Sequence, residues 1–467
     1  MKVFKLKSKH KKILADTLSP VSIYLKVRDV FSNSLLLESS EYNQNNKNFS
    51  YICCNPIASI QVHKNQVITE YPDGKKLIES ISKNINITER IYSFSKQFKV
   101  KDYPFKFINN GLFGYIAHEA IEYFEDIKLD ETKTGHNIPN IYYAIYQNII
   151  AISLFNHEAH IFSHTYNTNH NLDLINRLLQ NNNISTFKFK RVGSKTSNLS
   201  DNEFIKYVIK AKEHCKRGDV FQLVLSRSFS QKFHGDEFNV YRSLRSINPS
   251  PYLFFFDFGN FKIFGSSPEA QLIIEDGKAE IHPIAGTFKR TGDDKKDTES
   301  ALKLAKDPKE NSEHIMLVDL ARNDLSRNGS KVVVEKNREI QFFSHVIHLV
   351  SKVTCLLKKD VKSFQVVADT FPAGTLSGAP KHSALKLIDH YEKTERNFYG
   401  GAIGYLDFKG NFNHAIIIRS FLSKNQQLNY QAGAGIVANS VPESELQEVY
   451  NKLGALDKAL ENAEEII

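Results

Sequence analysis

The chain has 467 residues, 41% of them hydrophobic, which is enough for a large core in about two or three domains or in one large fold. Its formal charge of +9 comes from 61 basic and 52 acidic residues with no block of five Lys or Arg, so we expect no nucleic-acid or membrane partner. The basic N-terminus lacks the apolar segment of a signal peptide, and no run of about 18 apolar residues occurs, so we expect a soluble, cytoplasmic protein.

The cysteines give no sign of a metal centre or a catalytic thiol. Cys53, Cys54, Cys215 and Cys355 form no C-x-x-C pair and no metal-ligand spacing, so we interpret them as small buried side chains. The chain also lacks a Gly-x-Cys-x-Gly segment, which would indicate a glutamine-hydrolysing domain. Any such activity is therefore expected from another polypeptide.

Two regions are expected along the chain. Residues 20–190 have the composition of irregular strands and turns, with exposed Asn-rich loops at 43–48 and 167–171. The short polar segment 193–200 is interpreted as a linker. We therefore predict an N-terminal region at residues 1–192 and a second region at residues 200–462.

The second region opens with a well-marked helix. Ser200 and Glu203 form a capping box, apolar residues follow at helical spacing, and Gly218 ends the pattern. In the next segment, 220–226, the period of two places Gln222 on the opposite face from Leu223 and Leu225.

Consecutive strands are expected after that segment. They cover 252–258, 262–264, 271–274 and 279–284, and Asp276-Gly277 predicts a hairpin between the last two. Consecutive strands with interspersed helices favour an α+β fold over a doubly wound parallel sheet.

Two helices each offer a pair of carboxylates. Asp307-Pro308 marks the start of one helix, with Glu310 and Glu313 on a single face. Ser440 and Glu443 are interpreted as the capping box of the other helix, which carries Glu445, Glu448 and Lys452. If the pairs face each other across a cleft, a hard divalent cation such as Mg²⁺ would relieve their repulsion; solvated helix faces are the alternative.

Other groups could hold an anionic substrate. Backbone N–H groups of Gly433, Ala434 and Gly435 could cradle a carboxylate, and Arg419 could bind a second one bidentately. The segment 371–381 lacks the spacing of a phosphate-binding loop, because Pro380 removes a needed N–H, so we interpret it as a rigid turn before a helix at 384–391.

Four segments together carry a resemblance to a known family. They are Pro283-Ile-Ala-Gly-Thr287, Asp307 to Asp324, Phe371 to Lys381 and Gln431 to Gly435. In this order they resemble the chorismate-utilising enzymes. The resemblance implies an α+β fold of four α/β/β/α layers, with two packed sheets and helices outside, and makes residues 200–462 the chorismate-binding region.

The resemblance also implies roles for individual residues. Glu313 and Glu448 match the family's magnesium ligands, with Glu310 and Glu445 in the acidic shell. Glu269 matches the general acid, and His348 matches the histidine associated with loss of pyruvate, although His345 could take that role. The residues that match substrate-binding positions are Gly286, Thr287, Tyr399, Arg419, Gly433, Ala434, Gly435 and Lys452.

Two positions distinguish the members of this family. Members that add water carry a lysine base where this chain has Gln222, and aminodeoxychorismate synthases carry a nucleophilic lysine where it has Ala285. Without either amine, direct attack by ammonia remains, as in anthranilate synthase component I. This implies a glutamine amidotransferase subunit (component II) as partner, in a hetero-oligomer that we expect to be a heterotetramer. A lysine-independent aminodeoxychorismate synthase and a non-catalytic tryptophan-binding subunit are the alternatives.

Two further segments resemble the site at which tryptophan inhibits these synthases. One runs from Leu35 to Ser39, where Glu38 or Ser39 would contact the amino group of the inhibitor. The other contains Pro251, Tyr252 and Leu253. Without the resemblance, both segments would be interpreted as a buried strand end and a proline turn.

Overall fold

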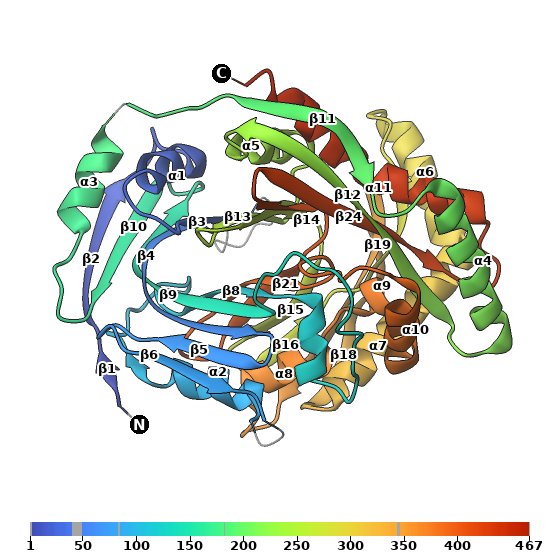
Figure 1. The fold of residues 1–467 in the computed structure, drawn as a ribbon, viewed down its shortest axis with the longest axis horizontal. Coiled ribbons are helices and arrows are strands. Elements are labelled where there is room, and N and C mark those ends of the chain that lie inside the picture. Colours follow the sequence, from blue (N-terminus) through green and yellow to red (C-terminus); the bar gives the residue numbers. More distant parts are fainter. Residues whose placement is uncertain (1, 40–48, 83–84, 182, 343–345, 467) are drawn as a thin grey trace.

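The computed structural model describes residues 2–39, 49–82, 85–181, 183–342 and 346–466. It confirms the α+β class, because antiparallel strands dominate and helices lie outside them (Figure 1). The helices of the described residues are α1 (Pro20–Arg28), α2 (Ile87–Ser95), η1 (His118–Tyr123, a 3-10 helix), α3 (Leu172–Gln180), α4 (Asp201–Arg217), α5 (Phe238–Ile247), α6 (Asp294–Lys306), α7 (Pro308–Ser326), α8 (Ser363–Thr370), α9 (Gly374–Ser377), α10 (Lys381–Tyr391) and α11 (Pro442–Ala463).

Both halves of the chain contribute strands. Those of the first half are β1 (Phe4–Lys5), β2 (Lys7–Leu14), β3 (Leu35–Glu38), β4 (Phe49–His63), β5 (Gln66–Glu70), β6 (Lys76–Ser80), β7 (Phe98–Lys99), β8 (Leu112–Ile116), β9 (Ile141–Ser153), β10 (Glu158–Thr165), β11 (Phe189–Ser197) and β12 (Gln222–Gly235). Those of the second half are β13 (Tyr252–Asp257), β14 (Lys262–Ser267), β15 (Ala270–Glu275), β16 (Lys278–Ile281), β17 (Ile284–Lys289), β18 (Gly329–Phe342), β19 (Val346–Leu357), β20 (Gly378–Ala379), β21 (Ala402–Leu406), β22 (Phe412–Ile416), β23 (Ser420–Lys424) and β24 (Gln427–Ile436).

Long-range ladders join the N-terminal and C-terminal regions. Strand β3 pairs antiparallel with β13, and β8 pairs antiparallel with β21. Strand β11 pairs with β12, so residues 193–197, predicted to be a linker, belong instead to a strand. The boundary between the two predicted regions remains a prediction, and strands from both sides of it share hydrogen bonds.

Several local predictions are confirmed. The backbone N–H of Ser200 donates to Glu203 Oε2 at 2.9 Å, and that of Glu203 donates to Ser200 Oγ at 3.3 Å. Gly218 ends α4 with a φ of 85°. Asp276 and Gly277 have φ values of 49° and 78°, the left-handed conformation that a two-residue turn needs at both positions, and they join β15 to β16.

Two layers of strands pack face to face. One apolar cluster combines Phe254, Phe256 and Ile263 of β13 and β14 with Phe113 of β8 and Ile403 of β21. In Figure 1, β13 and β14 lie above β8 and β21. The opposite faces of the strands pack against helices, which gives the layered arrangement that the resemblance implied.

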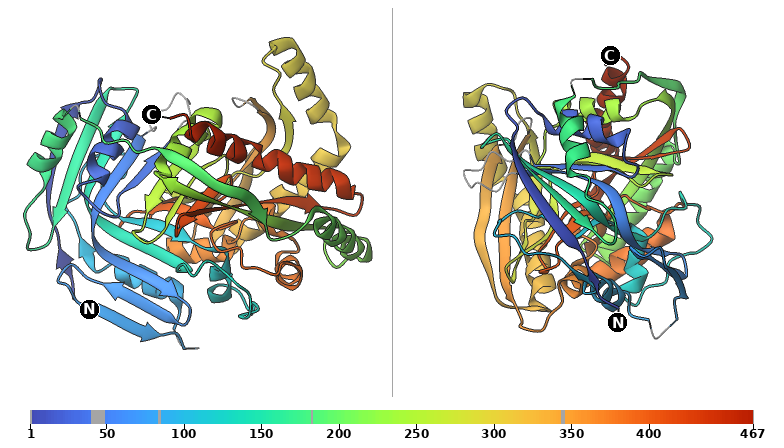
Figure 2. Two further views of the ribbon diagram at one scale, coloured as in Figure 1. Left: turned by 45° about the horizontal axis from the view of Figure 1, so that its top comes forward. Right: turned by 90° about the vertical axis from the view of Figure 1, so that its left-hand side faces the viewer.

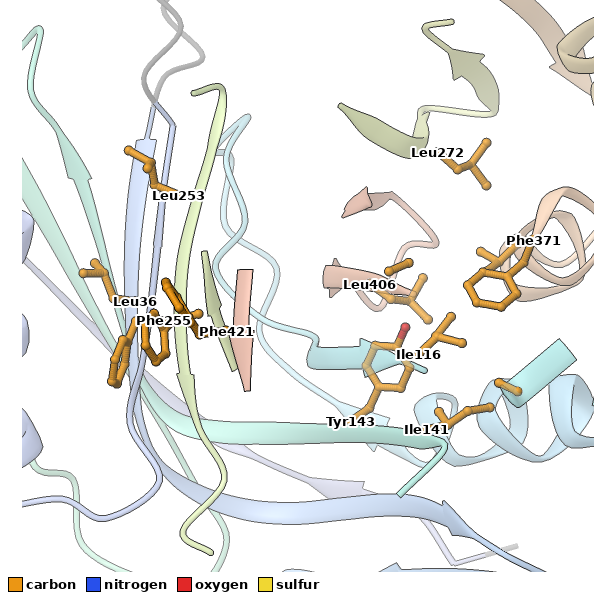
Figure 3. Packing of buried hydrophobic residues seen from close by; sticks show 14 of the residues in the cluster. Leu36, Ile116, Ile141, Tyr143, Leu253, Phe255, Leu272, Phe371, Leu406 and Phe421 are labelled. Carbon is orange, nitrogen blue, oxygen red and sulfur yellow. The ribbon is translucent and has the colours of Figure 1, made fainter. Parts of the chain in front are cut away.

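The largest apolar cluster extends through the whole molecule. Figure 3 shows Leu36, Phe255 and Phe421 in one group, drawn from three strands far apart in sequence. A second group in the same view contains Ile116, Tyr143 and Leu406. Burial of such side chains contributes about 1.5–3 kcal/mol each, so the core holds both regions in place around the site.

Helix α11 covers the strand that lines the candidate site. Its buried positions Val449, Leu453, Leu456 and Leu460 follow helical spacing, and the helix contacts β24 and α5. Figure 2 shows α11 along the outside of the strands, with α6 projecting beyond them. The remaining positions of α11 can carry polar side chains, and Lys452 Nζ reaches the Gly433 carbonyl of β24.

Candidate active site

Helix α7 presents two of the predicted carboxylates. The helix begins at Pro308, and the Glu310 backbone N–H donates to Asp307 Oδ1 at 3.1 Å, as the sequence predicted. Glu313 Oε1 accepts a hydrogen bond of 2.8 Å from Gln222 Nε2 of β12. Gln222 is buried and cannot act as a base, so at this position the site holds an amide against a carboxylate.

Helix α11 brings the second acidic pair, although its start differs from the prediction. Its N-cap is Val441, with no side-chain hydrogen bond, whereas Ser440 Oγ accepts from the Val437 N–H at 3.0 Å. The predicted capping box at Ser440 is therefore wrong, because the serine caps the preceding turn. Further along α11, Lys452 Nζ lies 2.6 Å from Glu448 Oε1. Glu445 is buried.

Residues 433–435 lie between these two helices. Their N–H groups were expected to cradle a carboxylate, but the residues are part of β24, paired with Val224 to Ser226 of β12. In a strand, successive N–H groups point to opposite edges, so the predicted cradle of consecutive donors does not form. The Gly433 carbonyl instead accepts from Lys452 Nζ at 2.8 Å.

The glycines of β24 allow side chains from three elements to approach. A Cβ at Gly435 would lie 2.4 Å from Gln222 Nε2 and 3.5 Å from Glu313 Oε1. A Cβ at Gly433 would lie 3.1 Å from the hydroxyl of Tyr399. The side-chain space beside β24 is therefore occupied by polar groups of α7, β12 and the Tyr399 segment.

Glu269 stands between β14 and β15 in a buried position. Burial raises the pKa of its carboxyl group to about 8, although Thr375 and the positive charges of Lys452 and Arg419 act in the opposite direction. Thr375 Oγ1 donates to Glu269 Oε1 at 3.1 Å. Glu269 is therefore largely protonated at neutral pH, which suits a general acid.

Arg419 and Tyr399 form the cationic and aromatic part of the site. Arg419 lies between β22 and β23 with a φ of 50°, beyond the end of β22 at Ile416. Burial lowers the pKa of Arg419, against the influence of Tyr399, Glu448 and Glu269. Burial also raises the pKa of Tyr399 to about 12, so its hydroxyl stays protonated as a donor.

His348 is fixed by the strand that carries Ala285. In the β17–β19 ladder, His348 stands opposite Thr287, and its Nδ1 lies 2.8 Å from the Gly286 carbonyl oxygen. Because a carbonyl only accepts, Nδ1 carries the proton, and burial lowers the pKa of the ring. The neutral ring therefore has an unprotonated Nε2, which can serve as a base. The competing candidate, His345, lies outside the described residues.

Ala285 and Gly286 complete the side of the site formed by β17. Ala285 is buried and pairs with Leu349, so no amine reaches the site from this position. Gly286 has a φ of 64°, and a Cβ there would lie 2.6 Å from Leu304 Cδ1 and 3.1 Å from Glu310 Oε2. This glycine therefore allows α7 to approach β17.

The predicted residues thus converge in one place. Contacts link β24 to both acidic helices, Gly286 to Glu310 and His348, and Glu269 electrostatically to Lys452 and Arg419. Thr375 was missed by the sequence interpretation, which treated the segment 371–381 as a turn. Its position in the family motif Phe371 to Lys381 was a signal that could have identified it.

The two predicted inhibitor segments also come together. Leu253 of β13 pairs with Glu38 of β3. The Glu38 carboxylate, buried, accepts from Tyr241 Oη at 2.6 Å and from Arg245 Nε and Nη2 at 2.8 and 2.9 Å. Because these donors already neutralise Glu38, Ser39 is the better candidate for contact with an amino group. Pro251 directly precedes β13, and Tyr252 is the first residue of that strand.

Comparison with known proteins agrees with this arrangement. The family model of the chorismate binding enzyme matches residues 32–458. The chain belongs to the chorismate binding enzyme family. In the part of this chorismate binding enzyme that the structure describes, no helix is long and apolar enough to cross a membrane.

Its similarity to proteins named anthranilate synthase component 1 covers nearly the whole chain. The protein from Acetivibrio thermocellus is 36% identical over 97% of this chain and 95% of its own length. That from Bacillus subtilis (strain 168) is 35% identical over 97% of this chain and 91% of its own. The predicted resemblance to anthranilate synthase component I is confirmed.

Solved structures show the same fold. Anthranilate synthase component I from Streptococcus pneumoniae TIGR4 has a TM-score of 0.73 and 28% identity, over 95% of this chain and 98% of its own. The menaquinone-specific isochorismate synthase from Escherichia coli has a TM-score of 0.75 over 98% of this chain and 96% of its own. At 17% identity, this similarity shows only that the two proteins share a fold.

Proposed function

We propose that this chorismate binding enzyme is an anthranilate synthase component I, which converts chorismate and ammonia to anthranilate, pyruvate and water. The observation that carries the proposal is the pair Gln222 and Ala285 in an otherwise complete site. Gln222 is held against Glu313, and Ala285 is buried in β17, so neither position provides an amine or a base. The nucleophile must therefore come from outside the chain.

The described side chains support a specific sequence of steps. Protonated Glu269 donates its proton to the departing ring hydroxyl while ammonia attacks the far carbon of the conjugated ring double bonds, which shift toward the carbon that loses the oxygen. His348 Nε2 then assists removal of the ring proton as pyruvate leaves and the ring becomes aromatic. One nitrogen enters, and water and pyruvate depart, which balances the reaction.

Substrate binding falls to groups that converge on β24. Arg419 suits a bidentate contact with one chorismate carboxylate, and Tyr399 and Lys452 add donors. Residues 433–435 and Gly286-Thr287 would contribute backbone contacts. Because β24 is a strand here, single N–H groups rather than a nest of them would bind the substrate.

The same site suits Mg²⁺ bound by Glu313 and Glu448, with Glu310 and Glu445 adding negative charge. The donor set is oxygen only, and Gln222 Oε1 is a buried acceptor with no hydrogen-bond partner among the described residues. The described residues contain no group of three His, Cys, Asp or Glu side chains placed to hold a metal. Oxygen atoms of the substrate and of water would therefore complete the coordination of Mg²⁺. When bound, Mg²⁺ would neutralise these carboxylates and hold the ring carboxylate of chorismate.

The partner in this proposal is a glutamine amidotransferase subunit, component II, in a cytoplasmic heterotetramer. The lack of a Gly-x-Cys-x-Gly turn in the chain supports it, because ammonia must be generated elsewhere. Tryptophan would inhibit the enzyme at the β3–β13 pair, with Ser39 receiving its amino group and residues 251–253 surrounding it. Aligned strand pairing of the two predicted segments supports this location.

An assay of the chain alone tests the proposal. Purified protein is incubated with chorismate, Mg²⁺ and excess ammonium at alkaline pH, and anthranilate is followed by its fluorescence. We expect anthranilate and pyruvate in equal amounts with ammonium, and none when glutamine replaces ammonium. Formation of isochorismate, salicylate or aminodeoxychorismate, or no reaction at all, would refute the proposal.

A further inference from the structure

A cavity lies close to the segment that carries Tyr399. It has a volume of about 310 Å³ and opens between η1 and α10; its lining includes His118, Glu119, Glu122, Glu395 and Arg396. We call it the η1–α10 cavity. None of these residues has a role in the proposed reaction, so the cavity needs its own explanation.

Arg396 and Gly400 separate this cavity from the candidate active site. The Arg396 guanidinium carbon is 5.7 Å from the centroid of the Tyr399 ring, and Nη1 donates to the Leu376 carbonyl at 2.7 Å. A Cβ at Gly400 would lie 3.7 Å from His118 Cδ2. A ligand in the η1–α10 cavity would therefore be separated from the Tyr399 segment by one layer of residues.

The lining carries an excess of negative charge. Among its described residues, seven carboxylates face three permanent cations, a difference of four charges: Glu119, Glu122, Asp130, Glu131, Asp389, Glu392 and Glu395 against Lys64, Lys133 and Arg396. Lys133 pairs with Asp389, and Arg396 pairs with Glu392 at 2.6 Å. Two of the three cations are therefore already committed, and the remaining carboxylates outnumber Lys64.

The uncompensated carboxylates influence one another. Burial and repulsion from neighbouring acids, Glu119 among them, raise the pKa of Glu122. Burial and the charge of Glu119 likewise raise the pKa of Glu395. A cation in the cavity would relieve this repulsion, because opposite charges in a partly buried site attract strongly.

Buried polar atoms without hydrogen-bond partners also line the cavity. Both ring nitrogens of His118, and Glu119 Oε2, have no hydrogen-bond partner among the described residues. Glu119 Oε1 accepts from the backbone N–H of Arg396 at 2.8 Å, which leaves Oε2 for another donor. Buried polar atoms of this kind cost free energy unless a ligand or water satisfies them.

We propose that the η1–α10 cavity binds a small protonated amine, either ammonium or a primary alkylammonium ion. Such an ion brings both the positive charge and the N–H donors that Glu119 and its neighbours lack. At about 30 Å³ per water molecule, the volume has room for a small amine with some of its hydration.

Binding is tested without chorismate. Radiolabelled methylammonium is measured by equilibrium dialysis against the full chain at constant ionic strength, with unlabelled ammonium, sodium or tetramethylammonium as competitor. We expect saturable binding that ammonium displaces and the other two ions do not. The absence of saturable binding, or equal displacement by sodium, would overturn the proposal.

Variants locate the binding. Glu119→Gln keeps the Oε1 acceptor and removes the charge, so it should weaken methylammonium binding at least tenfold, and Glu395→Gln should weaken it as well. Glu299→Gln, an exposed change of equal charge on α6, should leave binding unaltered. If Glu119→Gln fails to fold, as judged by circular dichroism, Glu395→Gln decides; unaltered binding in a folded variant would refute the location.

Any effect of this cavity on turnover rests on the proposed function, in which ammonia is a reactant. The two claims can fail separately. Anthranilate formation without methylammonium binding would refute the cavity assignment alone. Methylammonium binding that Glu119→Gln abolishes, in a chain that forms no anthranilate, would support the cavity assignment and refute the proposed function.

Discussion

The burial of Glu269 keeps its carboxyl group protonated, as a general acid requires. Its carboxyl group has a pKa of about 8 because burial disfavours the charged form. As a general acid it must be protonated, so kcat/KM for chorismate should fall as pH rises through about 8. The measurement is a pH profile at constant free ammonia, because ammonium itself deprotonates at alkaline pH. An activity that continues to rise above this range would contradict the assignment of Glu269 as the acid.

Thr375 should influence the pKa of the Glu269 carboxyl group. Its hydroxyl donates to Glu269 and lowers the carboxyl pKa, so Thr375→Val should shift the alkaline limb of the pH profile upward. A hydrogen bond to a charged group contributes about 1.5–3 kcal/mol, so a shift of about one to two pH units is expected. Thr375→Ser retains the hydroxyl and should restore the original profile. Identical profiles for the valine and serine variants would show that the contact does not influence the acid.

At the scale of single residues, the sequence predicted the chemical groups of the site better than it predicted the contacts between them. Gln222 and Ala285 exclude a lysine regardless of how the chain folds. The contact between Thr375 and Glu269 joins residues 106 positions apart, and the pairing of Glu38 with Arg245 joins residues 207 apart. Neither contact has a local sequence signal, so only the fold reveals them.

Helices α7 and α11 should act together through their carboxylates. Glu313→Gln or Glu448→Gln removes one negative oxygen donor, and we expect activity at low Mg²⁺ to fall about a hundredfold, since changes around metal sites cost about 10–100-fold. The measurement is anthranilate formation against Mg²⁺ concentration, after removal of bound metal with EDTA. Glu461→Gln, near the exposed end of α11, is the matched control and should leave the Mg²⁺ dependence unchanged. Near-normal activity of both variants at low Mg²⁺ would exclude these helices as the metal site.

The elements themselves were predictable where the signals are local. The α4 cap at Ser200 and the Asp276-Gly277 turn depend on residues within three positions of each other, and both predictions are confirmed. Ser440 shows the limit, because its hydroxyl caps the preceding turn at Val437 instead of the helix. Residues 193–197 continue β11, in which Thr196 and Ser197 pair with β12, although their polar composition suggested a linker.

At the scale of the whole molecule, the pairing of β3 with β13 joins the predicted regulatory segments to the catalytic strands. Ser39 directly follows β3, and its loss should remove a hydrogen bond to the amino group of tryptophan without reaching Glu269 or β24. Ser39→Ala should therefore raise the tryptophan concentration for half inhibition about tenfold, with turnover little altered. Ser32→Ala, in the preceding loop, serves as the control. Unchanged inhibition in the Ser39 variant would place the regulatory site elsewhere.

The class of the fold followed from the sequence, but the interleaving of its halves did not. Hairpins and consecutive strands predicted α+β, whereas the β8–β21 and β3–β13 ladders depend on pairing between distant segments. Such contacts are specified by the burial of whole faces rather than by local patterns. The acidic helices meet at β24 for the same reason.

The most direct test of the central claim is the origin of the atom that enters the ring. Chorismate is converted by the chain with Mg²⁺ in ¹⁵N-labelled ammonium and ¹⁸O-labelled water, and the products are analysed by mass spectrometry. The account predicts anthranilate with one ¹⁵N atom and no ¹⁸O from water in the ring. A hydroxylated product that carries ¹⁸O would show that water is the nucleophile and would contradict the account.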